Sequence, residues 1–215
     1  MEILQDSGSF EILAITDLVN IERAGRTCYQ SAVGLPTEKS AEKFTEMIIS
    51  RGHESVLEHS TMTVAFDGCS RGFTHELVRH RLASFSQEST RYVDYTRPDE
   101  IDLDRFELKV VCPPHKDPDE KLFVGEEGEY SFRDIANCIE GFYRGLRKAG
   151  WEPEDARQIL PIGTRSRIVV TANFREWRHI FKLRTAPEAH WEIRSVMTKL
   201  MHEARGKVPV VFDEI

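Results

Sequence analysis

Apolar residues recur every three or four positions in five long stretches of the chain. This is the spacing of helices that bury one face. Short helices are also expected at residues 70–78 and 154–161. The pattern therefore predicts long helices at residues 17–29, 40–50, 132–148, 173–183 and 187–204.

Two of these helices carry well-defined apolar stripes. We expect a buried stripe in each, which favours core or subunit contact over a cofactor site. Gly52 and Gly150 are expected to end the helices before them, because glycine readily adopts the left-handed backbone. Thr16 or Asp17 is a candidate cap for the first helix. The stripes consist of Ile135, Ile139, Phe142, Tyr143 and Leu146, and of Ile193, Val196, Met197, Leu200 and Met201.

Strict alternation of apolar and polar residues predicts strands between the helices. Residues 61–66 alternate with Met62, Val64 and Phe66 on one side, and residues 164–172 alternate with Ile168, Val170 and Ala172. Weaker strand patterns occur at 7–14 and 106–111, and residues 115–129 form a charged stretch expected at the surface. The order of elements predicts an α/β (α+β) fold with a mixed sheet and flanking helices.

Composition narrows the class of protein. A chain of 215 residues with 40% hydrophobic content is long enough for one sizeable core, so a single domain over residues 1–215 is expected. A net charge of -7 argues against general nucleic-acid binding, and no apolar run reaches the length of a membrane span. The N-terminus has no signal-peptide pattern, and the cysteines are scattered, as in a cytoplasmic protein with reduced thiols.

Cations concentrate in residues 79–92 of this acidic chain. Arginine presents a rigid fork of donors to phosphate or carboxylate, and nearby serine hydroxyls can complete an anion site. In an extended chain Arg79 and Arg81 would point one way and His80 the other. The stretch therefore predicts a site for phosphorylated small molecules, and the alternative is a set of solvated surface arginines.

A metal site is a second interpretation of the histidines. A zinc protease pattern needs a second histidine four positions after the first, but Leu57 follows His53 at that spacing and Arg79 follows His75. A metal hydrolase built on these residues and His59 therefore fails on spacing. The structural alternative for the first segment is a polar loop in which Ser55 caps a helix.

The order Arg79-His80-Arg81, seven further residues, then Ser89-x-Arg91 resembles the signature of the flavin-dependent thymidylate synthases. The resemblance extends from about residue 26 to residue 194. It implies a thymidylate synthase-complementing-like protomer that assembles into a homotetramer with shared active sites. Four other segments carry it: 53–55, 156–161, 173–179 and 183–193.

The resemblance also implies roles for individual residues. Arg184 would face the uracil ring and act in catalysis, where a fixed cation stabilises developing negative charge. The alternative for Arg184 alone is a cation at the C-terminal end of a helix dipole. The implied dUMP-binding residues are Glu76, Leu77, Val78, Arg79, Gln87, Glu88, Ser89, Thr90, Arg91, Arg157 and Arg184. The implied FAD-binding residues are His53, Ser55, Arg79, His80, Arg81, Gln87, Asn173, Phe174, Arg175 and His179.

The chemistry implied by the resemblance is the methylation of dUMP to dTMP. Methylenetetrahydrofolate supplies the carbon, FAD supplies the hydride, and NADPH reduces the flavin, so no cysteine nucleophile and no metal are required. Glu76, Gln87 and Glu188 stand where some relatives have glutamine, glutamate and histidine. The rival from another class is a non-catalytic nucleotide- or RNA-binding module. The enzyme hypothesis predicts that Arg79, Arg91, Arg157 and Arg184 converge on one pocket in the assembled protein.

Overall fold

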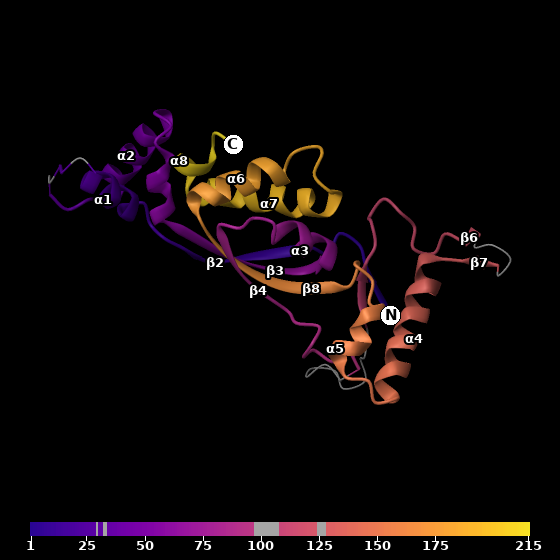
Figure 1. The fold of residues 1–215 in the computed structure, drawn as a ribbon. Coiled ribbons are helices and arrows are strands. Elements are labelled where there is room, and N and C mark those ends of the chain that lie inside the picture. The colour runs from indigo at the N-terminus through magenta and orange to yellow at the C-terminus, as the bar shows by residue number, and fades with distance from the viewer. Residues whose placement is uncertain (29, 32–33, 97–107, 124–127) are drawn as a thin grey trace. The chain divides into compact units, whose positions relative to one another are not determined.

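The largest sheet of the computed structural model has four strands in the order β2-β3-β8-β4 (Figure 1). Every second residue of β3 and of β8 is buried in its middle part, so the predicted alternation is confirmed. The fold is α/β with a sheet and flanking helices, as the pattern predicted. The strands are β2 (Ser9–Ile15), β3 (Thr61–Ser70), β8 (Arg165–Asn173) and β4 (Ala83–Gln87).

The structure describes residues 1–28, 30–31, 34–96, 108–123 and 128–215. These residues form two compact units, each built from several chain segments, and β3 and β8 contribute residues to both. The first unit comprises Met1–Ser9, Asp67–His75 and Gln87–Ile168. The second unit comprises Phe10–Phe66, Glu76–Ser86 and Val169–Ile215.

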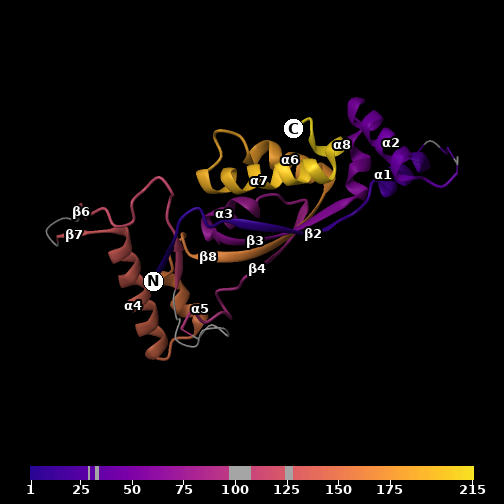
Figure 2. The same ribbon diagram turned by 180° about the vertical axis from the view of Figure 1, so that it is seen from behind.

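The second unit contains the helices that follow the last strand. Figures 1 and 2 show α6 (Phe174–Arg184) and α7 (Trp191–Lys207) side by side, with α8 (Pro209–Phe212) beside them. An aromatic cluster packs α6 against α8, with the rings of Phe174 and Phe181 each edge-on to Phe212. The stripe predicted on the last helix is buried, which confirms its interpretation as core.

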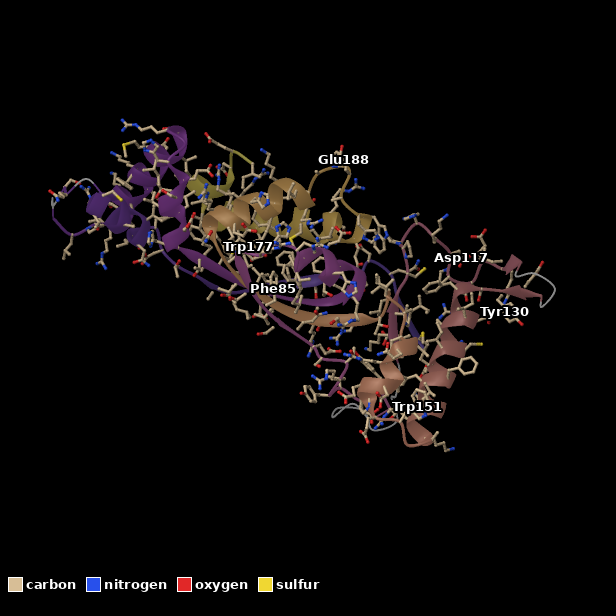
Figure 3. All side chains as sticks on the ribbon, viewed as in Figure 1. Phe85, Asp117, Tyr130, Trp151, Trp177 and Glu188 are labelled. Atoms are coloured by element: carbon tan, nitrogen blue, oxygen red, sulfur yellow. The ribbon has the colours of Figure 1, made fainter. Side chains whose placement is uncertain are left out.

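Trp177 fixes α6 to a strand of the second unit. Its ring is buried, and its indole nitrogen donates a hydrogen bond to the carbonyl oxygen of Met62 in β3 at 2.8 Å (Figure 3). A buried indole N–H normally needs such a partner. This bond sets the position of α6, the helix that carries several of the candidate site residues.

The remaining helices of the second unit are α1 (Val19–Cys28), α2 (Glu38–Ser50) and the 3-10 helix η1 (Glu54–His59). Asp17 caps α1, because its carboxylate accepts from the backbone N–H of Val19 at 3.0 Å. Gly52 ends α2 with φ +69°, as predicted.

Three predictions at helix starts in this region need correction. The helix expected from residue 40 begins at Glu38, because Thr37 and Ser40 form a capping box. Ser55 is not a cap: it lies inside η1, and His53 at the N-cap position makes no side-chain cap. The helix expected at 70–78 is α3 (Arg71–Leu77), one residue shorter at each end.

The first unit is built around α4 (Phe132–Lys148). Ser131 and Asp134 form a capping box at its start, and Gly150, with φ +90°, follows its end. The short helix predicted at residues 154–161 is divided into α5 (Pro153–Ala156) and the 3-10 helix η3 (Arg157–Ile159), which both contact α4.

Short strands complete the first unit. β1 (Glu2–Leu4) pairs in parallel with β5 (Lys109–Val111), and β6 (Leu122–Phe123) pairs antiparallel with β7 (Glu129–Tyr130). The surface stretch expected at 115–129 therefore contains strand residues. Part of the strand expected at 106–111 lies outside the described residues.

Burial of the predicted α4 stripe is only partly correct. Tyr143 is buried, but Phe142 is 70% exposed and Ile135 is 42% exposed. The helical period was right, yet the neighbouring elements cover only one side of the apolar face. An uncovered apolar strip therefore remains on α4 within the described structure.

Candidate active site

Arg184 lies at the end of α6 and is surrounded by groups that accept hydrogen bonds from it. Its Nε donates to His80 Nε2 at 3.0 Å. Its Nη1 donates to Glu76 Oε2 at 2.7 Å, and its Nη2 donates to the Glu76 carbonyl oxygen at 2.8 Å. The fold thus brings Arg184 to Glu76 and His80, which lie 108 and 104 residues earlier in the sequence, within the second unit.

His80 is the buried member of this group, with only 4% of its surface exposed. Its Nδ1 lies 3.3 Å from Glu176 Oε1, and its ring meets the ring of His179 edge-on at 5.6 Å. Burial, together with the positive charge of Arg184 and the proximity of His179, lowers the pKa of His80 to about 4. The imidazole is therefore neutral at pH 7.

The Arg79-His80-Arg81 segment is not a strand. It lies in the turn between α3 and β4, so the extended conformation expected there is wrong. Arg79 and Arg81 are nevertheless exposed while His80 is buried, so the expected alternation of sides holds. The turn achieves it because the backbone N–H of His80 bonds back to the Leu77 carbonyl oxygen at 3.2 Å.

A cavity of about 740 Å³ lies beside this group in the second unit. Asn173, Arg175 and His179, all implied as FAD-binding residues, line it. Arg175 forms an ion pair with Glu58 at 2.6 Å, and Asn173 caps α6 by accepting from the Glu176 N–H at 2.8 Å. The other lining residues are Glu54, Glu58, Leu82, Glu176, Arg178, Lys182, Thr185, Glu214 and Ile215.

Other residues implied by the resemblance lie in different settings. His53 and Ser55 are exposed, and Val78 is 37% exposed. Leu77 and Phe174 are fully buried in the core, so any contact that they make with a ligand would come from their backbone.

His80, Glu176 and His179 offer ligand atoms that lie within 4.8 Å of one another, as a metal ion would require. The pattern of histidines in the sequence pointed to His53, His59 and His75 and gave no sign of this group. The permanently charged guanidinium of Arg184 donates to His80 and opposes a second cation there. Both nitrogens of His80 already face partners, so the contacts favour a hydrogen-bonded group over a metal centre.

The first unit gathers a second set of predicted residues. Arg91 Nε donates to Glu154 Oε2 at 2.9 Å, and Arg157 Nε donates to the Glu154 carbonyl oxygen at 3.1 Å. Arg157 Nη1 also donates to Thr90 Oγ1 at 3.2 Å, and Ser89 Oγ accepts from the Arg91 N–H at 3.3 Å. Two arginines implied for dUMP therefore share one carboxylate-bearing residue.

Gln87 and Glu88 each make contacts that the sequence did not predict. Gln87 Nε2 donates to Thr74 Oγ1 at 2.8 Å and to Ser166 Oγ at 3.2 Å. Thr74 Oγ1 in turn donates to the Arg71 carbonyl oxygen at 3.0 Å. The amide of Gln87 is therefore the first member of a hydrogen-bond chain.

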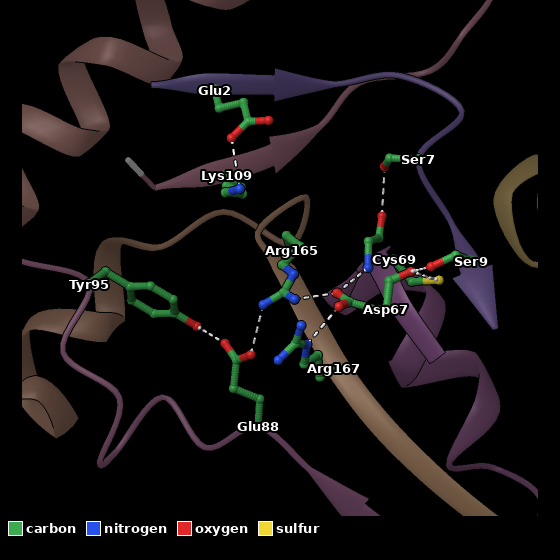
Figure 4. A network of polar contacts seen from close by, with 11 residues as sticks. Glu2, Ser7, Ser9, Asp67, Cys69, Glu88, Tyr95, Lys109, Arg165 and Arg167 are labelled. Carbon is green, nitrogen blue, oxygen red and sulfur yellow. Dashed lines mark hydrogen bonds and ion pairs between the residues drawn. The ribbon is translucent and has the colours of Figure 1, made fainter. Parts of the chain in front are cut away.

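Glu88 belongs to an ion-pair network in the first unit (Figure 4). Its carboxylate accepts from Tyr95 Oη at 2.9 Å and from Arg165 Nη1 at 3.0 Å. Arg165 also pairs with Asp67, which accepts from Arg167 Nε at 2.6 Å. Burial would raise the pKa of Asp67, but the two arginines and the Gly68 N–H lower it more.

Several functional candidates were missed by sequence reasoning. Glu176 stands three residues after Asn173, the spacing of the first turn of a helix, so nothing separates it from an ordinary helix residue. Arg165 and Arg167 are two residues apart on a strand and share one face of it, a pattern typical of any solvated face of a sheet. Their carboxylate partner, Asp67, is almost a hundred residues away, and only the fold brings it near.

Known protein families supply the next observation. The model of the family described as thymidylate synthase complementing protein matches residues 12–210 of this chain. The chain belongs to this family. The resemblance drawn from the arginine signature is thereby confirmed.

Relatives of known name support the family assignment. The flavin-dependent thymidylate synthase of Pyrococcus furiosus is 39% identical over 167 residues, which cover 78% of this chain and 64% of the relative. The enzyme of the same name from Clostridium tetani is 34% identical over 208 residues, covering 89% of this chain and 79% of the relative. The chain thus spans less than two thirds of the Pyrococcus furiosus relative.

A solved structure agrees with the fold. The UMP/dUMP methylase PolB from Streptomyces cacaoi, bound with 5-Br dUMP, matches 99% of this chain and 96% of its own chain. The TM-score is 0.73 at 21% sequence identity, so this likeness concerns the fold. None of the helices in the described part of the chain has the length and apolar character of a membrane span.

Proposed function

We propose that this protein is a flavin-dependent thymidylate synthase that methylates dUMP to dTMP. Methylenetetrahydrofolate would supply the carbon, and NADPH-reduced FAD the hydride. The observation that carries the proposal is the end of α6, where Arg184 contacts Glu76 and the signature residue His80. Family membership and the relatives named flavin-dependent thymidylate synthase support the same reaction.

Arg184 is the proposed catalytic residue. Its guanidinium is held by three hydrogen bonds, one from each nitrogen, so it presents a fixed positive charge. Such a preorganised cation stabilises negative charge that develops on a uracil ring during reaction at the ring carbon. The imidazole of His80 is neutral at pH 7 and adds no second positive charge beside the guanidinium, which also pairs with the Glu76 carboxylate.

The cavity beside α6 fits the proposed flavin. Its volume of about 740 Å³ lies within the range of ~300–1,000 Å³ that small-molecule and cofactor sites occupy. Arg175, His179 and Lys182 bring N–H donors suited to a pyrophosphate, and Asn173 adds an amide. FAD, when bound, would supply the hydride, while these residues bind and orient it.

The group around Glu154 is the proposed site for the dUMP phosphate. Arg91 is exposed and pairs with the Glu154 carboxylate, a contact that an incoming phosphate can replace. Arg157 is held nearby by Thr90, and the Ser89 hydroxyl lies on the same loop. We also propose that Arg79 and Arg81, both exposed, contact the bound ligands.

The assembly and location belong to the proposal as well. We propose one functional domain over the whole chain, a cytoplasmic location and a homotetramer with shared active sites. The uncovered strip of Ile135 and Phe142 on α4 supports an assembly, because apolar residues aligned on one helix face commonly mark an interface. Light scattering of the purified protein measures the number of subunits directly.

One experiment tests the reaction. Purified protein loaded with FAD should show the absorbance of oxidised flavin, lose it with NADPH and form dTMP from dUMP and methylenetetrahydrofolate. Arg184→Ala should lower turnover about 100- to 1,000-fold, as removal of one stabilising donor does in other enzymes. Arg194→Ala on α7 is the matched control: it removes a guanidinium bonded to the Pro187 carbonyl oxygen before that helix and should keep full activity.

Two results would oppose the proposal. Protein that stays colourless in the presence of FAD, while binding RNA with steep salt dependence, would favour the non-catalytic alternative. Near-normal turnover in Arg184→Ala would remove Arg184 from the catalytic role.

A further inference from the structure

The two ring nitrogens of His80 have partners of opposite character. Arg184 Nε always carries its proton, so the bond of 3.0 Å to His80 Nε2 requires Nε2 to be the acceptor. A neutral imidazole with a free Nε2 carries its proton on Nδ1. That proton faces Glu176 Oε1, 3.3 Å from Nδ1. The contacts therefore define one tautomer of a buried histidine.

We propose that Glu176 and His80 are positioning residues for Arg184. The Glu176 carboxylate accepts the Nδ1 proton and holds the ring in this tautomer, and His80 Nε2 then accepts from Arg184 Nε. Neither residue needs to touch a substrate for this role. The catalytic consequence rests on the proposed function, but the tautomer itself does not.

The contact between Arg184 Nε and His80 holds the part of the guanidinium that Glu76 does not contact. Glu76 alone holds Nη1 and Nη2, but its side chain is partly exposed and belongs to the helix end before the turn. His80 and Glu176 are both buried, so they can hold Nε in one place. A displacement of about 1 Å in a catalytic group can lower a rate about 100-fold.

The opposite tautomer would break the arrangement. A proton on Nε2 would place two donors face to face, and Arg184 Nε would lose its acceptor. Protonation of His80 has the same effect, although its low pKa delays this to strongly acidic solution. Among the described residues, Glu176, His179 and Arg184 contact the ring, and Glu76 acts on it through its pair with Arg184.

Of the two buried residues, Glu176 takes up a proton before His80 as the pH falls. Burial raises its pKa, and the nearby His179 opposes the rise. A protonated carboxyl can donate to Nδ1, and the ring proton would then move to Nε2. Acid should therefore disturb Arg184 through Glu176 as well as through His80.

The test begins with ¹⁵N NMR of histidine-labelled protein at pH 7, without flavin or dUMP. The expected spectrum of His80, assigned with His80→Gln, shows a protonated Nδ1 and an unprotonated Nε2. A protonated Nε2 in the unmodified protein would overturn the proposal, and this measurement needs no variant of Glu176 to fold.

Variants at position 176 provide the second readout. Glu176→Gln keeps an acceptor oxygen, so it should keep the tautomer and a kcat within about threefold of normal. Glu176→Leu should allow the Nε2-H form and lower kcat about 10- to 100-fold. It should also abolish the acid limb due to residue 176 in the pH profile. Glu203→Leu, on an exposed part of α7, is the control and should change none of these.

The outcomes separate the two proposals. If Glu176→Leu keeps the tautomer and the kcat of the unmodified enzyme, the positioning role is wrong. If the tautomer is found but the unmodified protein makes no dTMP, the proposed function fails, while the contacts by which Glu176 and His80 position Arg184 stand.

Discussion

Replacement of Arg147 by methionine should destabilise the first unit strongly, because it removes the partner of a nearly buried carboxylate. Arg147 Nη2 donates to Asp94 Oδ2 at 2.8 Å, and the two side chains are 18% and 6% exposed. Asp94 keeps two contacts from Thr96, from its N–H at 3.0 Å and its hydroxyl at 2.7 Å.

The size of the effect follows from the pKa of Asp94. Burial raises it, but Arg147 and Thr96 together lower it from 3.8 to about 2. A depression of this size corresponds to about 2 kcal/mol of stability. Once Arg147 is gone, the uncompensated cost of burial adds to the loss, so we expect about 2–4 kcal/mol at pH 7.

The pH dependence has a definite sign. A depressed pKa gives stability that is complete above the unfolded value of 3.8 and lost as pH falls towards 2. In Arg147→Met the carboxyl should protonate at or above its usual pKa. The stability difference between the two proteins should therefore narrow below about pH 4.

Urea unfolding of the flavin-free protein, followed by tryptophan fluorescence, measures this difference. Arg133→Met is the matched control on the same helix, because its exposed pair with Asp119 should contribute less than about 1 kcal/mol. If Arg147→Met costs no more than Arg133→Met, or if its cost is the same at pH 7 and pH 3, the reasoning about Asp94 is refuted.

Two further predictions concern backbone and core. Gly68→Ala should destabilise by about 1–3 kcal/mol, because φ is +67° and a Cβ would lie 2.2 Å from the Ser7 carbonyl oxygen. Gly145→Ala, in open space on α4, should instead be neutral or stabilise by up to about 1 kcal/mol. Thermal unfolding measures both glycine variants. Trp177→Phe should cost about 1–3 kcal/mol in urea unfolding, because the Met62 carbonyl oxygen loses its buried donor. An unchanged midpoint would show that this bond does not hold α6.

The periodic parts of the fold could be predicted from the sequence because each depends on neighbouring residues. The alternation around Val64 and Val170 identified the two central strands, and Gly52 marked a helix end. The exposure of Phe142 could not be predicted in this way. Periodicity gives the apolar face of a helix, but the extent to which other elements cover it depends on tertiary packing.

Some residues of the candidate site could be predicted from the sequence, and others only from the fold. The resemblance selected Arg184, His80 and Glu76 individually, and the structure brings them into contact. It gave no sign of Glu176, because an acidic residue in the first turn of a helix is ordinary. The convergence of Arg79, Arg91, Arg157 and Arg184 on one pocket stays a prediction.

The amide at position 87 gives its surroundings a direction. The Gln87 nitrogen donates a hydrogen bond to Thr74 Oγ1, and Thr74 Oγ1 donates one to the Arg71 carbonyl oxygen. The Thr74 hydroxyl therefore accepts on one side and donates on the other. A carboxylate in this place would demand protons, and Thr74 would have to turn away from Arg71 to supply one. A glutamate here would therefore reverse the bond to Thr74 and take the Thr74 donor away from the Arg71 carbonyl oxygen, although its shape is almost that of glutamine.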